Sequence, residues 1–199
     1  MTSQTQYWNR LIQPGIVALV GAGGKTTVLS KLVEYGRLQG QPIVVTTTTQ
    51  LYESQVAQYE PIYTKDINDV DEYCTKRIQQ GYCGAWFNGI TRTKVDAVDC
   101  ESIDGLSALH PNWQIVVEAD GAKEKWLKAP KHTEPVIPSQ TKTTIGVVNL
   151  QMLGASLDED HVHNLELVQS IVHREEGAIV TPHMLAQIVL HKQGLFQYS

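Results

Sequence analysis

The sequence predicts an α/β fold, built on a mainly parallel sheet with flanking helices. Three observations indicate it: short apolar runs rich in β-branched residues, glycine-rich or polar turns directly after them, and apolar residues at helical spacing in between. Apolar runs without alternation are typical of strands buried on both faces, which is the environment of a parallel sheet. We therefore expect three layers, α/β/α, with helices on both faces of the sheet.

The first β-α-β unit is predicted over residues 15–50. Residues 16–20 form an apolar, β-branched run that predicts a buried strand. From Thr26 onward apolar residues recur at helical spacing, and Gly40 is placed to end the helix. Residues 42–46 predict a second strand, parallel to the first because a helix joins the two.

The remaining elements follow in the same way. The patterns predict a helix over 69–80 and strands over 83–90, 114–118 and 144–150. Between the last two strands, residues 121–143 are polar and rich in lysine and proline. Such a segment is longer than a loop that merely connects two strands in a compact domain, so we expect a lid-like functional loop.

A helical C-terminal part is predicted over residues 156–196. Apolar residues at 165, 168, 171 and 172 indicate one helix, and Thr181 followed by Pro182 indicates the capped start of another. Gly194 is expected to end that last helix. With 199 residues the chain has the length of one ordinary domain, and we expect residues 1–199 to form a single unit.

The composition excludes several classes of function. The chain has 16 basic and 21 acidic residues, and a net charge of -5 argues against a large non-specific nucleic-acid surface. No apolar stretch reaches the roughly 18 residues of a membrane helix, and the N-terminus carries no export signal. Three cysteines without a C-x-x-C pair indicate neither a disulfide framework nor a cysteine zinc site. We expect a cytoplasmic protein whose partners are small ligands or proteins.

A glycine-rich loop between the first strand and the first helix is the strongest chemical signal. Its residues are Gly21, Ala22, Gly23, Gly24, Lys25, Thr26 and Thr27. Glycines let backbone N–H groups face phosphate oxygens, and the helix N-terminus adds partial positive charge. We expect Lys25 to reach the outer phosphates of ATP or GTP and the Thr26 hydroxyl to ligate Mg²⁺. The loop is a shortened form, because Leu19 stands where the usual pattern begins with glycine, and it resembles the loop of Mur-type amide ligases. The alternative is a glycine-rich turn without a ligand.

Two acidic residues follow the apolar part of strand 114–118. Glu118 and Asp120 share one face by strand alternation, so they are candidates to converge on one Mg²⁺ ion. Asp120 is also a candidate to orient a nucleophile, which makes it, with Lys25, the candidate catalytic pair. The alternative is that the two acids mark the start of an exposed loop.

Two further groups of residues are candidates for substrate contacts. In the threonine run 46–49, β-propensity explains Thr46 and Thr47, whereas Thr48 and Thr49 lie past the strand on the side where α/β sheets bind ligands. The long loop offers a cationic lid over a phosphate or an anionic substrate, or else a solvated face. Its candidate residues are Lys123, Lys125, Lys128, Lys131, His132 and Glu134.

The pair His161 and His163 follows three acidic residues at 158–160. A metal site is one interpretation of this pattern. We favour an acidic helix start with two surface histidines, because acidic residues are common in the first turn of a helix.

Several of these segments together resemble the YqeC family. The similarity is carried by residues 20–27, 46–49, 117–123, 127–130 and 134–138, and it runs from about residue 15 to residue 194. That family comprises predicted P-loop proteins associated with the maturation of selenium-dependent molybdenum hydroxylases. The resemblance therefore implies a P-loop NTPase-like fold, a nucleotide-dependent accessory role with Mg²⁺, and a molybdenum hydroxylase or its cofactor as partner.

The resemblance also implies roles for single residues. It places Lys25 and Thr26 on phosphate and Mg²⁺, and Glu118 and Asp120 on the metal. It places Lys128, His132 and Glu134 near a second substrate. Where the family has arginine after the histidine, this chain has Asn164 after His163. The resemblance also implies that relatives continue through another strand with an Asn-Lys pair that is a candidate to read the base, so ATP and GTP both stay open.

Three functions stay open at this point. The first is a Mg²⁺-dependent NTPase or phosphotransferase. The second is a binding module switched by nucleotide, without substantial catalysis of its own. An ATP-dependent ligase is less expected, because 199 residues leave no room for a second ligase domain.

Overall fold

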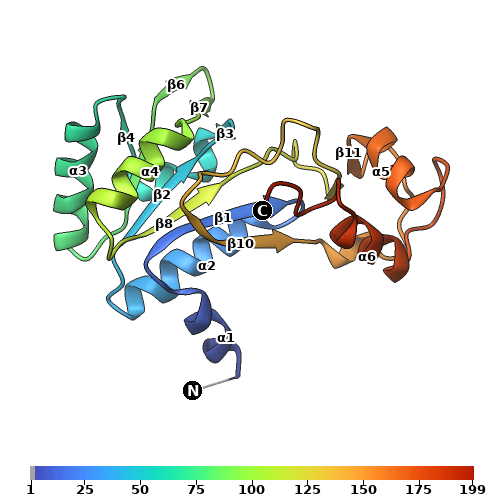
Figure 1. Ribbon diagram of the computed structural model, residues 1–199, viewed down its shortest axis with the longest axis horizontal. Helices are drawn as coiled ribbons and strands as arrows, with labels where there is room; N and C mark the ends of the chain where they lie inside the picture. The colour runs from blue at the N-terminus through green and yellow to red at the C-terminus, as the bar shows by residue number, and fades with distance from the viewer. Residues whose placement is uncertain (1–2) are drawn as a thin grey trace. The chain divides into compact units, whose positions relative to one another are not determined.

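The computed structural model describes the backbone of residues 3–199 and the side chains of residues 7–199 (Figure 1). The helices are α1 (Ser3–Leu11), α2 (Lys25–Leu38), α3 (Ile67–Gln79), α4 (Cys100–Leu109), α5 (Leu165–Val172) and α6 (Pro182–Leu190). The strands are β1 (Gly15–Gly21), β2 (Ile43–Thr47), β3 (Leu51–Tyr52), β4 (Ile62–Tyr63), β5 (Gly84–Phe87), β6 (Gly89–Thr91), β7 (Lys94–Asp96), β8 (Gln114–Glu118), β9 (Leu127–Lys128), β10 (Thr141–Val147) and β11 (Val162–His163). Short 3-10 helices are η1 (Glu53–Gln55), η2 (Ala57–Tyr59) and η3 (Leu150–Met152).

Six strands form the main sheet, in the order β10-β1-β8-β2-β5-β4. The pairs β2–β8, β2–β5 and β4–β5 are parallel. Strands β1, β2 and β8 are buried along their whole length, as expected for strands that contain runs of apolar residues without alternation. The prediction of an α/β fold with a mainly parallel sheet and flanking helices is confirmed. The strand that carries Glu118 lies between β1 and β2.

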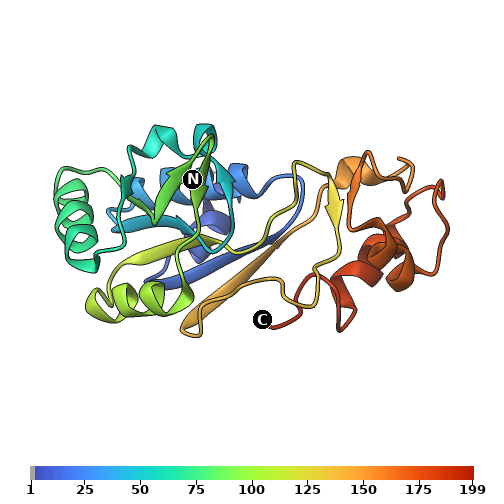
Figure 2. The ribbon, with the colours of Figure 1, turned by 90° about the horizontal axis from the view of Figure 1, so that it is seen from above.

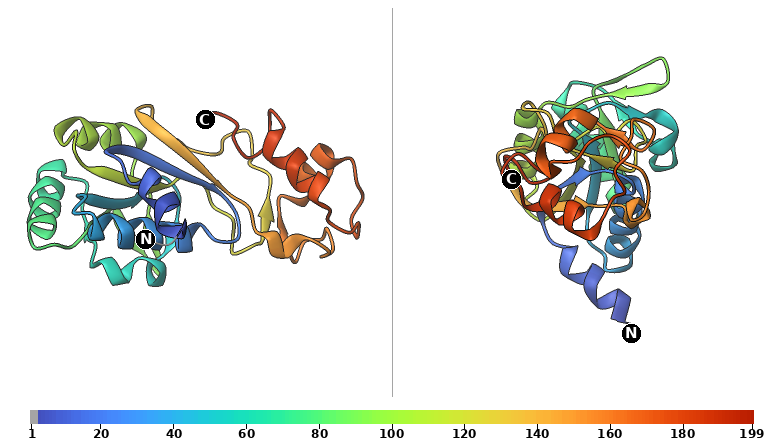
Figure 3. Two further views of the ribbon diagram at one scale, coloured as in Figure 1. Left: turned by 90° about the horizontal axis from the view of Figure 1, so that it is seen from below. Right: turned by 90° about the vertical axis from the view of Figure 1, so that its right-hand side faces the viewer.

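The chain forms two compact units. The first comprises the described residues up to 18, residues 26–118 and residues 137–143. Its core is made by apolar side chains of α2, β2, β5 and β8, including Leu29, Leu32, Val44, Val45, Trp86, Phe87, Ile115 and Val116. Figures 2 and 3 show α2 and α4 on opposite sides of the strands of this unit. A small antiparallel sheet, β3-β7-β6, is added to it.

The second unit comprises residues 19–25, 119–136 and 144–199. Its core joins α5 and α6 to η3 and to part of the long loop: Leu127 and Ala129 pack with Met152, Val168 and other apolar residues. Strands β9 and β11 pair in parallel, with Leu127 opposite Val162. The loop predicted as a lid therefore contributes buried residues to a core.

Several predicted boundaries are wrong. The predicted strand 83–90 is two strands in different sheets, β5 and β6, because Asn88 interrupts it and donates from its side chain to the Ala97 carbonyl at 2.7 Å. The last predicted strand begins at Thr141 rather than residue 144, and it ends at Val147 because Asn149 caps η3.

The C-terminal part holds two further corrections. Helix α6 is capped by the Thr181 hydroxyl, as predicted, but it ends at Leu190 because His191 has extended backbone angles. Gly194 instead fills a tight turn, where an added Cβ would lie 2.0 Å from the Ile188 carbonyl oxygen. The acidic residues 158–160 do not start a helix, since α5 begins at Leu165. Within residues 3–199 no helix combines the length and the apolar character needed to cross a membrane.

Candidate functional site

The glycine-rich loop has a backbone shape that requires glycine. Gly21, Gly23 and Gly24 have positive φ angles of 101°, 69° and 150°. An added Cβ at Gly21 would lie 2.2 Å from the Val147 carbonyl oxygen, and one at Gly23 would lie 2.4 Å from Asn149 Cβ. Side chains at these two positions would clash, so the loop packs its backbone directly against the end of β10 and the residues after it.

The loop lysine is buried, and it contacts the backbone of its own loop and an aspartate. Lys25 is the first residue of α2, and its Nζ donates to the Gly21 carbonyl at 2.6 Å. The same Nζ lies 3.0 Å from Asp120 Oδ1 in an ion pair whose side chains are 4% and 1% exposed. Asp120 Oδ2 accepts the Gly21 N–H at 3.0 Å. Asp120 therefore fixes both the first residue of the loop and its lysine.

A second lysine continues this chain of charges. Lys128 is fully buried, and its Nζ donates to the Gly121 carbonyl at 2.7 Å and to Glu134 Oε2 at 2.9 Å. It also lies 3.3 Å from Asp120 Oδ2. Lys25, Asp120, Lys128 and Glu134 thus form an alternating network of two cations and two anions, which we call the lysine network. Burial raises the pKa of Glu134, but the hydrogen bond and charge of Lys128 lower it more, so the net pKa lies below its usual value.

A histidine lies beside the lysine network. In the pairing of β11 with β9, His163 stands opposite Lys128. Burial lowers the pKa of His163, and the charges of Lys128 and Lys123 lower it further. His163 also lines a pocket of about 590 Å³, which we call the lysine pocket. Three lysines line it, Lys123, Lys125 and Lys131, together with two carboxylates, Glu159 and Glu166. The interpretation of His163 as a plain surface histidine is therefore wrong, since it is half-buried and faces several ammonium groups.

The loop segment before Pro135 is held by the end of the chain. Gln197 is buried, and its side-chain amide donates to the carbonyls of Lys131 and Glu134. Tyr198 donates its hydroxyl to the His132 carbonyl at 3.0 Å. The side chain of His132 is exposed and lines a different pocket, with Tyr198 among its neighbours. Of the three residues expected near a second substrate, the structure brings Lys128 and Glu134 together and leaves His132 apart from them.

The other predicted site residues belong to the first unit. Thr46 and Thr47 lie in β2, as predicted, while Thr48 and Thr49 follow it. Thr47 Oγ1 lies 2.8 Å from the Glu118 carbonyl oxygen and accepts the Thr49 N–H at 3.1 Å. The Thr48 N–H donates to that same carbonyl at 3.2 Å. The threonine run is therefore tied to the end of β8, where the Glu118 side chain is 5% exposed.

Sequence patterns missed the contacts made by two glutamines, Gln55 and Gln197. Gln55 Nε2 donates to the Thr26 hydroxyl at 3.4 Å. Gln55 lies in a three-residue 3-10 helix, and Gln197 follows the last helix, so neither belongs to a periodic pattern. No sequence pattern indicated that His163 is half-buried. Its neighbour Asn164, where this chain departs from the family, donates from its side chain to the Ala129 carbonyl at 2.8 Å.

Among residues 3–199 no group of three or more His, Cys, Asp or Glu side chains is placed to hold a metal ion. His161 Nδ1 is instead paired with Asp158 Oδ1 at 2.6 Å. The hydrogen bond to His161 lowers the pKa of Asp158 below its usual range.

Comparison with known proteins identifies relatives of the chain. It is 28% identical over 186 residues to the "Uncharacterized protein YqeC" of Escherichia coli (strain K12), an alignment that covers 93% of this chain and 71% of that protein. No solved structure gives a significant match. The family model described as "YqeC protein" matches residues 17–166, which include the glycine-rich loop and the whole lysine network. The chain belongs to the YqeC family.

Proposed function

We propose that this chain is a Mg²⁺-dependent nucleotide-binding protein with a P-loop NTPase-like fold, acting as an NTPase or phosphotransferase. The observation that carries the proposal is the joint fixation of the loop and Lys25 by Asp120, at the end of β1 and at the start of a helix. Backbone N–H groups, a helix N-terminus and a lysine in this order are what phosphate groups bind. In the proposal the phosphates take the place that Asp120 and the Gly21 carbonyl now hold at Lys25.

The metal ligands are proposed with one restriction. Both carboxylate oxygens of Asp120 are engaged, by Lys25 on one side and by the Gly21 N–H and Lys128 on the other. Asp120 therefore suits a metal ion only after Lys25 has exchanged it for phosphate. We assign Mg²⁺ to oxygens of Thr26, Glu118 and, in that second state, Asp120. When bound, the ion neutralises phosphate charge and orients the transferred group.

The lysine pocket supports an anionic second substrate. Lys123 and Lys131 form no ion pair or side-chain hydrogen bond with any described residue, and Lys125 donates only to the Asp160 carbonyl. The depressed pKa keeps His163 largely neutral at pH 7, so it is able to take up a proton as an anion enters. The role in maturation of selenium-dependent molybdenum hydroxylases rests on the family resemblance, and a cofactor bearing phosphate would fit this pocket by charge.

Calorimetric titration with ATP and GTP in the presence of Mg²⁺ tests the proposal. Lys25→Ala should weaken binding about tenfold or more, because a charged hydrogen bond to phosphate is lost. Lys31→Ala is the matched control, since Lys31 lies on the same helix and, among the described residues, forms an ion pair with exposed Glu34 alone. Equal nucleotide affinity of the wild type and a folded Lys25→Ala variant contradicts the proposal. Thr26→Ala adds an independent check, because it should reduce the dependence of binding on Mg²⁺.

The lysine network also favours a second candidate, a nucleotide-controlled switch. Lys128 is shared between Asp120 and Glu134, so in this candidate the departure of Lys25 from Asp120 draws Lys128 toward Asp120 and weakens its pair with Glu134. Turnover of ATP and GTP separates the candidates. Fast hydrolysis by the isolated protein excludes a pure switch. Slow hydrolysis that rises only when a selenium-dependent molybdenum hydroxylase is added supports one.

A further inference from the structure

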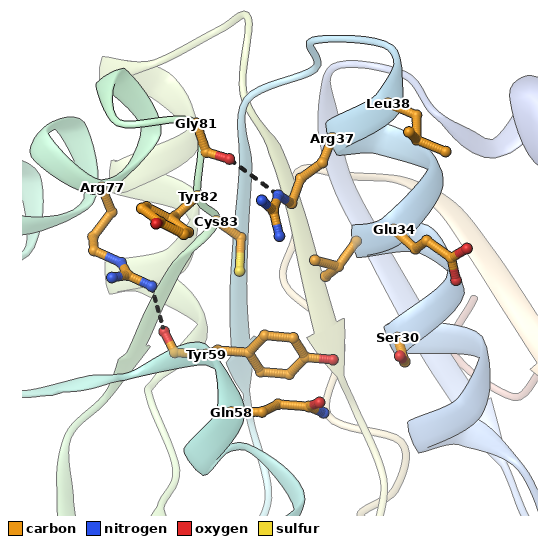
Figure 4. A pocket seen from close by; sticks show the side chains of 11 residues that line it. Ser30, Glu34, Arg37, Leu38, Gln58, Tyr59, Arg77, Gly81, Tyr82 and Cys83 are labelled. Atoms are coloured by element: carbon orange, nitrogen blue, oxygen red, sulfur yellow. Dashed lines mark hydrogen bonds between the residues drawn. The ribbon is translucent and has the colours of Figure 1, made fainter.

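A pocket of about 560 Å³ within the first unit is lined by none of the residues discussed so far as candidate site residues (Figure 4). Its walls come from the second half of α2, from η2 and from the turn that follows α3. Two arginines stand in it, Arg37 of α2 and Arg77 of α3. We call it the arginine pocket.

Arg37 is fixed in place but keeps most of its donors available. Its Nε donates to the Gly81 carbonyl at 3.0 Å. Its two terminal nitrogens form no hydrogen bond or ion pair with any residue that the structure describes. Figure 4 shows the guanidinium group turned into the pocket. A guanidinium held at Nε presents a rigid fork of N–H groups, which is the geometry that carboxylates and phosphates bind with two hydrogen bonds.

The second arginine adds charge to the same place. Arg77 Cζ lies 4.6 Å from the centroid of the Tyr82 ring, and Arg37 Cζ lies 5.5 Å from it. Two cations therefore share one aromatic ring. This arrangement concentrates positive charge at one end of the pocket and orients both guanidinium groups by their contact with the ring.

The carboxylates near the pocket compensate the charge of Arg77 but not that of Arg37. Arg77 Nη1 pairs with Glu60 Oε2 at 2.5 Å. Glu34, which also lines the pocket, is paired with Lys31 at 2.6 Å. The two pairs are neutral, so the charge of Arg37 remains without a carboxylate partner among the described residues. An anion is the ligand that this end of the pocket lacks.

The rest of the pocket lining is partly aromatic and apolar. The ring of Tyr59 lies along it in Figure 4, and the Cys83 thiol points toward that ring. Val33 completes this wall. Burial raises the pKa of Cys83 above its ordinary value, and the two arginines lower it by less. The thiol thus stays protonated at neutral pH and acts as an apolar contact rather than as a nucleophile.

We propose that the arginine pocket binds a small molecule that joins an oxyanion to a flat apolar body, with Arg37 gripping the oxyanion and Tyr59 contacting the body. Phosphate and carboxylate groups share the required chemistry. The site is separate from the proposed nucleotide site, so its test does not depend on nucleotide binding.

Titration of the full chain with four probes, followed by the amide NMR signals of residues 81–83, tests this inference. The probes are phenyl phosphate, benzoate, inorganic phosphate and phenol. We expect phenyl phosphate or benzoate to bind about tenfold or more tightly than phenol and inorganic phosphate, because only they supply both contacts. The tighter of the two identifies the preferred oxyanion. Phenol binding as tightly as both acids overturns the proposal.

Variants locate the probe. Arg37→Gln should weaken phenyl phosphate binding about tenfold, and Arg37→Lys should recover only part of it, since lysine keeps the charge but loses the fork. Lys76→Gln is the matched control, because it removes one exposed charge beside Arg77 outside the pocket, and it should leave the affinity unchanged. Lys25→Ala should also have no effect. Equal weakening by Lys76→Gln, or loss of binding in Lys25→Ala, overturns the assignment to this pocket.

Discussion

Replacing Lys128 with methionine should cause a large loss of stability. Its ammonium group has no solvent exposure, and it contacts the Gly121 carbonyl, Glu134 and Asp120 at 2.7, 2.9 and 3.3 Å. Methionine preserves most of the side-chain volume, so the change removes mainly the charge and the hydrogen bonds. Removing one partner of a buried ion pair typically costs about 3–5 kcal/mol. We expect a loss in this range for Lys128→Met.

Urea denaturation at pH 7, followed by tryptophan fluorescence and circular dichroism, measures this loss. Lys123→Met is the matched control in the same loop, because Lys123 has no side-chain partner among the described residues. Its free energy of unfolding should change by no more than about 0.5 kcal/mol. The double variant Lys128→Met, Glu134→Gln should be more stable than Lys128→Met alone, since it no longer strands the Glu134 carboxylate.

Two results would refute the reasoning. One is a loss below about 1 kcal/mol in Lys128→Met, which would mean that water or a shifted side chain replaces the ammonium group at little cost. The other is a double variant that is less stable than the single one. In that case Glu134 would stabilise the loop through contacts other than its pair with Lys128.

Three further predictions follow from the geometry. Gly23→Ala should lower the free energy of unfolding by about 1–3 kcal/mol in thermal unfolding, because the added Cβ meets an asparagine side chain. Gly40 has a similar positive φ angle but no atoms near its Cβ position, so Gly40→Ala should cost about 1 kcal/mol or less. In NMR titration His163 should show a pKa below 6.5, and Lys123→Met should raise it by removing a positive charge. At pH 7 the wild type should have a larger free energy of unfolding than Glu134→Gln, because the ionised Glu134 carboxylate pairs with Lys128. This difference should disappear as the pH falls from about 4.5 through the lower pKa of folded Glu134. A difference that does not depend on pH would contradict this prediction.

The elements that could be predicted are those whose own residues decide their structure. Strands β1, β2 and β8 contain runs of apolar residues without alternation, and burial of these runs on both faces follows from that composition. Helix α2 follows a glycine loop and has a clear apolar face. The cap of α6 was also predictable, because Thr181 and Pro182 act through local backbone geometry.

Other elements escaped prediction because partners distant in sequence stabilise them. Strand β9 has two residues, too few for any periodicity, and exists because β11 pairs with it. Helix α4 buries only Ile103 and Leu106 among its apolar residues and contains a glycine, so its pattern was weak. Helix α6 stops at Leu190, before the polar residues His191, Lys192 and Gln193, rather than at Gly194.

The sequence indicated several residues of the candidate site, but not the contacts that join them. The loop, Lys25 and Asp120 stand out as residue types at strand ends. Lys128 lies in a lysine-rich polar segment, where lysine side chains are normally exposed. Its complete burial depends on Asp120 and Glu134, which no local pattern relates to it. The same holds for Gln197, whose amide secures the loop from the far end of the chain.

The charge balance of the lysine network has a consequence for ligand binding. With two ammonium groups and two carboxylates it is electrically neutral, and three of its four side chains are at most 4% exposed. An anion that draws Lys25 from Asp120 adds negative charge to this place and leaves one carboxylate with less compensation. Entry of negative charge must therefore be matched by a counter-ion or a proton. Under the proposed function, a nucleotide should therefore arrive together with its metal, and free nucleotide without a divalent cation should bind poorly.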